Sequence, residues 1–151
     1  MKTVITKSEV DTRSLGKRLG RVMCKGDIVA LCGELGSGKT VLTKGIAEGL
    51  DVKGAGYVNS PSFIILKEYK GRLPLYHFDI YRLDEASDFL TVDYAGFFYG
   101  DGVTVIEWAD RIERLLPEEF LKIEMTVIGE CERKIDIRPQ GKRYKKMIGR
   151  L

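Results

Sequence analysis

The segment from Gly33 to Thr40, with the sequence GELGSGKT, carries the most specific chemistry in the chain. Its pattern, Gly-x-x-x-x-Gly-Lys-Thr, is typical of a loop that binds the phosphates of a nucleotide. Backbone N–H groups of such a loop can point at phosphate oxygens because glycine has no Cβ in the way. A helix beginning near Gly38 would add its positive dipole end, Lys39 would contact the β- and γ-phosphates, and the Thr40 hydroxyl would bind Mg²⁺. We therefore predict a site for a nucleoside triphosphate and Mg²⁺ with contacts from Glu34, Leu35, Gly36, Ser37, Gly38, Lys39, Thr40 and Val41.

Hydrolysis of a bound nucleotide also needs an acid near the metal, and two carboxylates qualify. Glu107 and Asp79 each end an apolar run, at 103–107 and 75–79. At the carboxyl end of a strand, such a side chain projects into the crevice where α/β folds bind ligands. We prefer Glu107 as the acid beside Mg²⁺, because its run is the more apolar, and Asp79 as a second acid that positions water. The predicted catalytic residues are Lys39, Glu107 and Asp79, and which acid activates water is left open.

Motifs that the sequence lacks indicate which nucleotide is bound and which reaction is catalysed. Guanine-specific P-loop proteins use an Asn-Lys-x-Asp segment, whereas the only asparagine here, Asn59, precedes Ser60, so ATP is favoured. A small-molecule kinase is one alternative to an ATPase, although the segment 84–102 contains no Lys or Arg for a basic lid. A nucleotide-dependent adaptor that does not hydrolyse ATP is the other alternative.

An α/β framework must position these groups, because apolar runs of strand type alternate with helical periodicity. Ser8 can cap a first helix, whose apolar residues recur up to Met23 before Gly26 ends it. The other expected elements are strands at 28–32, 63–69, 75–79 and 103–107, a helix at 109–116, and paired strands at 121–128 and 133–139. We predict a three-layer P-loop NTPase fold with a mixed, mainly parallel central sheet and a C-terminal antiparallel hairpin.

Length and composition predict one ATPase domain at residues 1–139 and a basic, mobile tail at 140–151. The 151 residues are 44% hydrophobic, enough for a core, and a net charge of +3 with 31% charged residues predicts a surface of mixed sign. The aromatic residues between 84 and 102 are expected to pack inward, and the three cysteines match no metal spacing. Because no apolar run approaches the roughly 20 residues of a membrane span and no h-region follows Met1, we expect a cytoplasmic protein without membrane contact.

Four segments together resemble the TsaE (YjeE) family: Leu31 to Thr40, Asn59 to Phe63 (NSPSF), Tyr76 to Leu83 (YHFDIYRL) and Ile106 to Trp108 (IEW). Their order and spacing are similar to the family pattern over nearly the whole chain. The resemblance implies a bacterial ATPase of threonylcarbamoyladenosine synthesis in tRNA. It also implies docking on TsaD and TsaB, repeated turnover of TsaD enabled by ATP hydrolysis, and contact with tRNA only through that complex.

The resemblance implies further roles outside the glycine-rich segment. Ser62 stands where the family has the threonine of a switch-like Ser-Pro-Thr-Phe loop, with an ordinary turn as the alternative. Thr12 matches an adenine-side contact, with a solvent-facing helix threonine as the alternative. Trp108 is either a switch or base-side contact or a core residue, and His77 is expected to be structural rather than catalytic. The basic residues of 142–150 either contact tRNA or an acidic partner or are only solvated.

Overall fold

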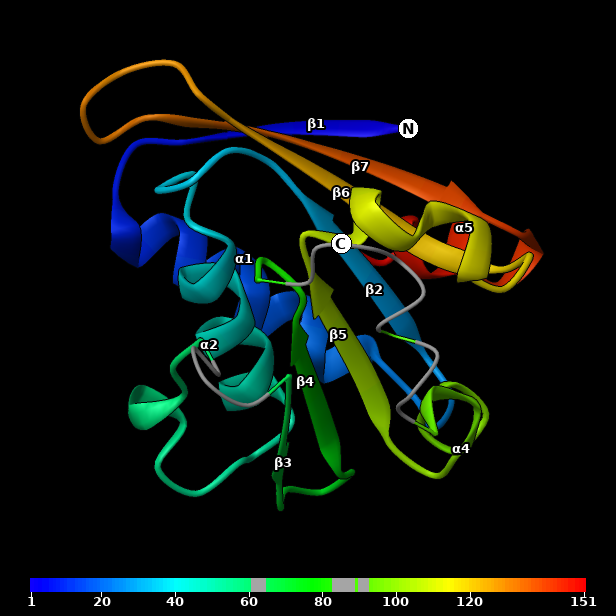
Figure 1. Ribbon diagram of the computed structural model, residues 1–151. Coiled ribbons are helices and arrows are strands. Elements are labelled where there is room, and N and C mark those ends of the chain that lie inside the picture. The colour runs from blue at the N-terminus through cyan, green and yellow to red at the C-terminus, as the bar shows by residue number, and fades with distance from the viewer. Residues whose placement is uncertain (61–64, 83–88, 90–92) are drawn as a thin grey trace.

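The protein is built on a seven-stranded β-sheet with helices on both faces (Figure 1). The computed structural model describes residues 1–151 except 61–64, 83–88 and 90–92. In spatial order the strands are β1 (Lys2–Thr6), β7 (Arg133–Gln140), β6 (Phe120–Val127), β2 (Ile28–Cys32), β5 (Val103–Glu107), β4 (Leu75–Asp79) and β3 (Leu66–Tyr69).

The sheet is mixed, and most of its strands run in one direction. The pairs β6–β2, β2–β5 and β5–β4 are parallel. β7 is antiparallel to β6, β1 is antiparallel to β7, and β3 is antiparallel to β4. Five of the seven described strands therefore share one direction, with β3 and β7 opposed. The predicted mixed, mainly parallel sheet and its C-terminal hairpin are confirmed.

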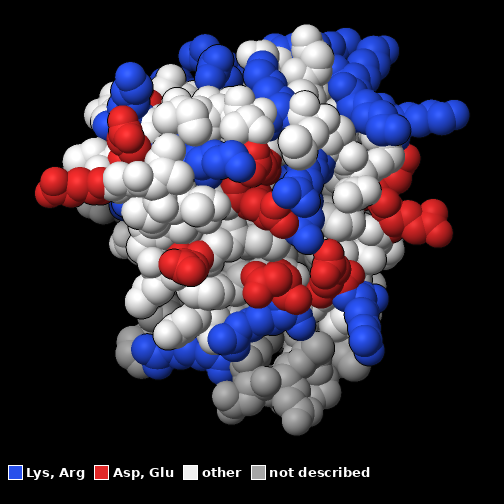
Figure 2. Space-filling model, turned by 90° about the horizontal axis from the view of Figure 1, so that it is seen from above, with Lys and Arg blue, Asp and Glu red and all other residues white. Residues whose placement is uncertain are grey.

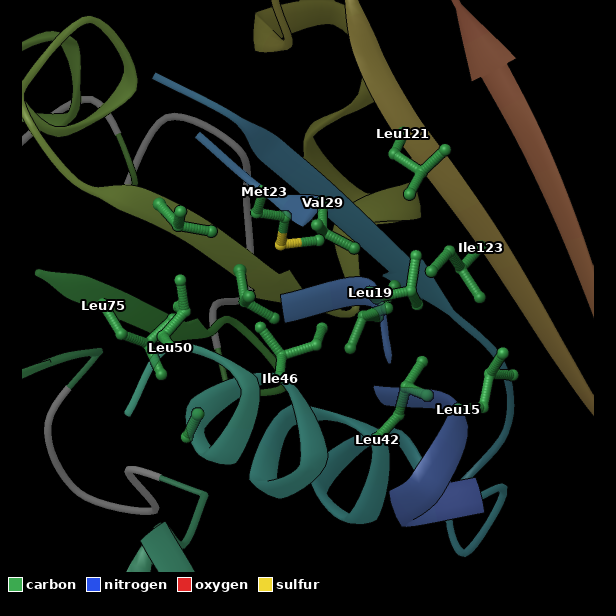
Figure 3. Packing of buried hydrophobic residues seen from close by; sticks show 14 of the residues in the cluster. Leu15, Leu19, Met23, Val29, Leu42, Ile46, Leu50, Leu75, Leu121 and Ile123 are labelled. Carbon is green, nitrogen blue, oxygen red and sulfur yellow. The ribbon is translucent and has the colours of Figure 1, made fainter. Parts of the chain in front are cut away.

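Two hydrophobic clusters lie on opposite faces of the sheet, because successive residues of a strand point to opposite sides. Val29 and Leu31 of β2 belong to one cluster, and Ile28 and Ala30 to the other. The first cluster, shown in Figure 3, contains residues of α1 (Glu9–Val22), α2 (Lys39–Gly49), η1 (Ala55–Tyr57) and α5 (Lys142–Ile148). The second contains residues of α4 (Tyr94–Phe98) and η2 (Ala109–Leu115). The predicted three layers are confirmed.

The helices α1 and α2 pack backbone against backbone through facing glycines. A Cβ on Gly16 would lie 2.3 Å from a carbonyl oxygen of α2, and a Cβ on Gly45 would lie 2.1 Å from a carbonyl oxygen of α1. Gly20 and Gly49 make the equivalent approach farther along the two helices. Because α2 begins at Lys39, this close packing fixes the helix that carries the lysine and threonine of the GELGSGKT segment.

Most predicted elements are present at or near their predicted bounds. Ser8 caps α1, since its hydroxyl accepts a hydrogen bond of 3.0 Å from the backbone N–H of Asp11. The strands at 28–32, 75–79 and 103–107 are confirmed, whereas the strand predicted at 63–69 is described only from Leu66 onward. The helix predicted at 109–116 is a 3₁₀ helix with a kink at Ile112 (φ −124°). β1 has no counterpart among the predicted elements, because as a short edge strand it lacks a continuous apolar run.

The C-terminal residues differ from the mobile tail that the sequence predicts. Residues 142–148 form α5, in which Tyr144 and Met147 are buried in the core. The Tyr144 hydroxyl accepts a hydrogen bond of 2.8 Å from the backbone N–H of Ile28, and Arg143 Nε donates to Asp27 Oδ1 over 2.6 Å. The prediction of a mobile tail is therefore wrong for this helix, because two apolar side chains at helical spacing anchor it beneath its basic residues.

One aromatic residue departs from the predicted inward packing. Phe89 and Phe98 are buried, and Tyr94 and Phe97 pack against the same cluster. Tyr99 is instead 74% exposed, because the chain has already left α4 there and turns away from the core.

The surface mixes positive and negative charge, as the composition predicts. Figure 2 shows the molecule from above, turned by 90° from Figure 1. Lys and Arg side chains are mixed with Asp and Glu side chains over much of this face. Within the described part of the chain, no helix combines the length and the hydropathy that crossing a bilayer requires.

Candidate functional site

The glycine loop, as we call residues 33–40, connects the carboxyl end of β2 to the first turn of α2. Gly33 has a φ of +145°, and a Cβ there would lie 2.4 Å from the carbonyl oxygen of Met125 on β6. Only glycine fits this position, because the loop passes directly over the neighbouring strand. The strand–loop–helix context that the GELGSGKT pattern requires is therefore present.

Lys39 is folded back over the loop that precedes it. Its Nζ donates hydrogen bonds to the carbonyl oxygens of Gly33 (2.7 Å) and Glu34 (2.8 Å). The same ammonium lies 3.8 Å from the ring centroid of Trp108, a cation–π distance. Burial lowers the pKa of Lys39, while the carboxylates of Glu107 and Asp79 oppose that shift. The structure thus brings the predicted lysine to the two predicted acids.

Glu107 lies at the end of β5 and is almost fully buried, with 2% of its surface exposed. Its Oε2 accepts a hydrogen bond of 3.0 Å from the hydroxyl of Thr40. Its Oε1 lies 2.8 Å from Nε2 of His77 and 3.2 Å from the hydroxyl of Thr43. A buried carboxylate needs such donors, because desolvation without them would be costly. The predicted pair of Thr40 and Glu107 is therefore in direct contact.

Asp79 lies beside Glu107, as its register partner on β4. It is half-buried, and its Oδ1 accepts a hydrogen bond of 3.0 Å from the backbone N–H of Tyr81. Burial raises the pKa of Asp79, and the charge of Glu107 acts in the same direction. The hydrogen bond from Tyr81 and the charge of Lys39 oppose the shift. Asp79 therefore holds a proton more readily than an ordinary aspartate.

Trp108 links the site to the surface beyond it. Its backbone is left-handed (φ 64°, ψ 34°), which turns the chain from β5 into η2. The ring is half-buried, lies 4.8 Å from the ring of Tyr81 and has the Arg111 guanidinium 5.9 Å away. The ring also packs against the second core cluster. Trp108 thus packs against the core, as one of its two predicted readings has it, and also contacts Lys39; its role as a switch or base-side contact stays a prediction.

The other predicted contacts are spread over the loop and its surroundings. Glu34, Leu35 and Gly36 are exposed, Ser37 is buried and Val41 is half-buried. Ser62 lies outside the described residues.

Thr12 is not the solvent-facing residue of the alternative reading, since only 2% of it is exposed. Its hydroxyl lies 2.8 Å from that of Thr6, and its methyl group lies 4.0 Å from where a Cβ of Gly38 would stand. Thr12 therefore lies close to Gly38 of the glycine loop.

Two residues near the glycine loop, Thr43 and Arg133, are not among the predicted site residues. Thr43 faces Glu107 because it lies one helical turn after Thr40, so the two hydroxyls share one face of α2, a spacing that is visible in the sequence. Arg133 of β7 donates a hydrogen bond of 3.3 Å to the carbonyl oxygen of Gly36. No local signal indicates that contact, because the two residues are 97 positions apart.

Comparisons with known proteins agree with this fold. The sequence model of one family, described as threonylcarbamoyl adenosine biosynthesis protein TsaE, matches residues 6–135. The tRNA threonylcarbamoyladenosine biosynthesis protein TsaE of Bacillus subtilis is 43% identical over 142 residues, 93% of this chain and 87% of that protein. Its namesake in Treponema pallidum is 39% identical over 133 residues, 88% of this chain and 97% of that protein. A crystal structure of Bacillus subtilis YdiB superposes with a TM-score of 0.82 at 37% identity, covering 98% of this chain and 91% of YdiB. The chain therefore belongs to the TsaE family, with that family's P-loop type of fold.

Proposed function

We propose that the protein binds ATP with Mg²⁺ at the glycine loop and hydrolyses it in the cytoplasm, in support of threonylcarbamoyl modification of tRNA. The observation that carries this proposal is the contact between Thr40 and Glu107, 3.0 Å between oxygens, beside the buried ammonium of Lys39. The names of the relatives from Bacillus subtilis and Treponema pallidum support the pathway.

Thr40 and Glu107 are the residues that would hold Mg²⁺. The Thr40 hydroxyl donates a hydrogen bond to Glu107, so the lone pairs of its oxygen remain available to a cation. Hydroxyl and carboxylate oxygens are the hard donors that Mg²⁺ prefers, and Mg²⁺ is usually bound through few protein ligands together with substrate phosphates. The ion would supply charge neutralisation at the phosphate oxygens.

Lys39 and the loop backbone would bind the triphosphate itself. The ammonium already donates to loop carbonyls, and exchanging these for phosphate oxygens would replace neutral acceptors by charged ones. The exposed backbone from Glu34 to Gly36 offers N–H groups to the same anion. Thr12 would act through its position next to Gly38, and Trp108 through its contact with Lys39.

Asp79 is the better of the two acids for orienting the attacking water. Glu107 is 2% exposed and both of its oxygens already face donors. Asp79 is half-buried, and burial raises its pKa, so once ionised it accepts a proton more readily than an ordinary aspartate does. Glu107 would then orient Thr40 and hold Mg²⁺ with it, while Asp79 acts on the water.

Calorimetric titration with Mg-ATP tests the binding step. Because hydrogen bonds to charged groups contribute about 1.5–3 kcal/mol, Lys39→Ala should weaken binding by about tenfold or more. Lys44→Ala, on the same helix but outside the site, is the matched control and should bind like the wild type. Equal affinities for Lys39→Ala and the wild type would refute the site.

Phosphate release in the presence of TsaD and TsaB tests the proposed role. Turnover should rise when both partners are added, and a pull-down should show docking that depends on the nucleotide. If neither partner binds under any nucleotide condition, the docking proposal fails. If the γ-phosphate passes to a small molecule rather than to water, the protein is instead a kinase.

A further inference from the structure

His77, expected from its sequence position to be only structural, makes its one described polar contact with a proposed catalytic carboxylate. Its ring is fully buried in β4, on the same face of the sheet as Asp79. Its Nε2 lies 2.8 Å from Oε1 of Glu107 on the adjoining strand. His77 therefore helps to orient Glu107, although among the described contacts it touches no residue of the glycine loop, which includes Thr40.

Three donors contact the two carboxylate oxygens of Glu107. Thr40 donates to Oε2, and His77 faces Oε1. Thr43 also faces Oε1, but its hydroxyl lies closer to the carbonyl oxygen of Lys39 (3.0 Å) than to Glu107 (3.2 Å). Because a hydroxyl has a single proton, Thr43 can serve only one of these acceptors fully. His77 is therefore the donor committed to Oε1.

The surroundings of the ring select its tautomer. Nδ1 of His77 is buried and has no hydrogen-bond partner among the described residues. A proton on Nε2 gives Glu107 a donor and leaves only a lone pair at Nδ1. A proton on Nδ1 alone would set the Nε2 lone pair against the carboxylate and bury a donor without an acceptor. The geometry thus favours the Nε2–H form.

We propose that His77 is a positioning residue, whose Nε2–H holds Oε1 of Glu107 so that Oε2 accepts the hydrogen bond of the Thr40 hydroxyl. This inference rests on the proposed Mg-ATP function of Thr40 and Glu107. Without that hydrogen bond the carboxylate can rotate, and the Thr40 hydroxyl loses its fixed acceptor. Partners that orient metal-site ligands in this way usually change metal affinity or activity by about 10–100-fold when they are removed.

A matched pair of amide substitutions separates positioning from mere packing. The amide nitrogen of His77→Gln can approach the place of Nε2, whereas that of His77→Asn approaches the place of Nδ1. Mg-dependent ATP binding is measured by calorimetry over a series of Mg²⁺ concentrations, alongside thermal unfolding. His77→Asn should need about tenfold more Mg²⁺ for half-maximal enhancement of ATP binding, while His77→Gln stays within about twofold of the wild type. ATP binding without Mg²⁺ should be the same in all three proteins.

Nitrogen NMR of the unmodified protein gives an independent readout. His77 is the only histidine, so its ring produces a single set of resonances. The spectrum should show the proton on Nε2, and Glu107→Gln should shift that signal. A proton found on Nδ1 alone, or equal Mg²⁺ dependence in His77→Asn and the wild type, would overturn the inference. If the wild type shows the Nε2–H form but no Mg-dependent ATP binding, the proposed function fails while the hydrogen bond stands.

Discussion

Gly45→Ala tests the helix packing that positions the glycine loop. The added Cβ would lie 2.1 Å from the carbonyl oxygen of Arg13 and 2.9 Å from Cα of Gly16, so α1 and α2 must separate by more than 1 Å to restore ordinary contact at 3.4 Å. Overpacking destabilises proteins by about 1–3 kcal/mol, and the upper value applies because backbone rather than a flexible side chain obstructs the Cβ. The better helix propensity of alanine offsets about 1 kcal/mol, which leaves a net loss of about 2 kcal/mol.

Thermal unfolding followed by circular dichroism measures this loss. For a chain of this length, 1 kcal/mol corresponds to about 2–4 °C, so Gly45→Ala should lower Tm by about 4–8 °C. Gly96→Ala is the control, because Gly96 also lies in a helix but a Cβ there would meet nothing nearer than 3.5 Å. That control should keep or slightly raise Tm. A Gly45→Ala protein as stable as the wild type would refute the close packing of α1 and α2.

Three other outcomes follow from buried polar groups. Burial raises the pKa of Asp79 above 3.8 in the folded protein, so the stability of the wild type falls as the pH rises from 3.8 through that folded-state pKa. The side chain of Asp79→Asn cannot ionise and escapes this loss. The Tm of the variant relative to the wild type should therefore rise from about pH 4 upward. A Tm difference that does not change with pH would contradict this. Tyr144→Phe removes the acceptor for the buried N–H of Ile28 and should lower the free energy of unfolding in urea by about 1–2 kcal/mol, so an unchanged midpoint would argue against the anchoring of α5. Burial raises the pKa of Cys32 to about 11, so at pH 8 a thiol reagent should modify two cysteines in the folded protein, the exposed Cys24 and Cys131, and the third only after denaturation.

The glycine loop and the central strands were predictable because their signals are local. Gly33, Lys39 and Thr40 lie within one short segment, and the requirement for glycine, a cation and a hydroxyl follows from phosphate chemistry alone. The strands at 28–32 and 103–107 are continuous apolar runs, which predict strands buried on both faces. The acids at the ends of two such strands followed from the same reasoning.

The edges of the molecule were harder to predict. β1 is an alternating strand that becomes recognisable only through its antiparallel pairing with β7. In the sequence α5 looks like a charged tail, because five of the residues from Lys142 to Arg150 are basic. Only two side chains, Tyr144 and Met147, anchor it in the core. Their burial depends on a core surface formed by distant parts of the chain, which no local period reports.

The glycine loop, the strand–loop–helix order and the choice of carboxylates thus follow from residue types and spacing. The network around Glu107 does not. Its donors Thr40, Thr43 and His77 are 67, 64 and 30 positions away, and they meet only because β4 and β5 pair in one register while α2 packs above them. Hydrogen-bond partners on separate elements are set by strand register and helix packing, which depend on the whole core rather than on any single segment.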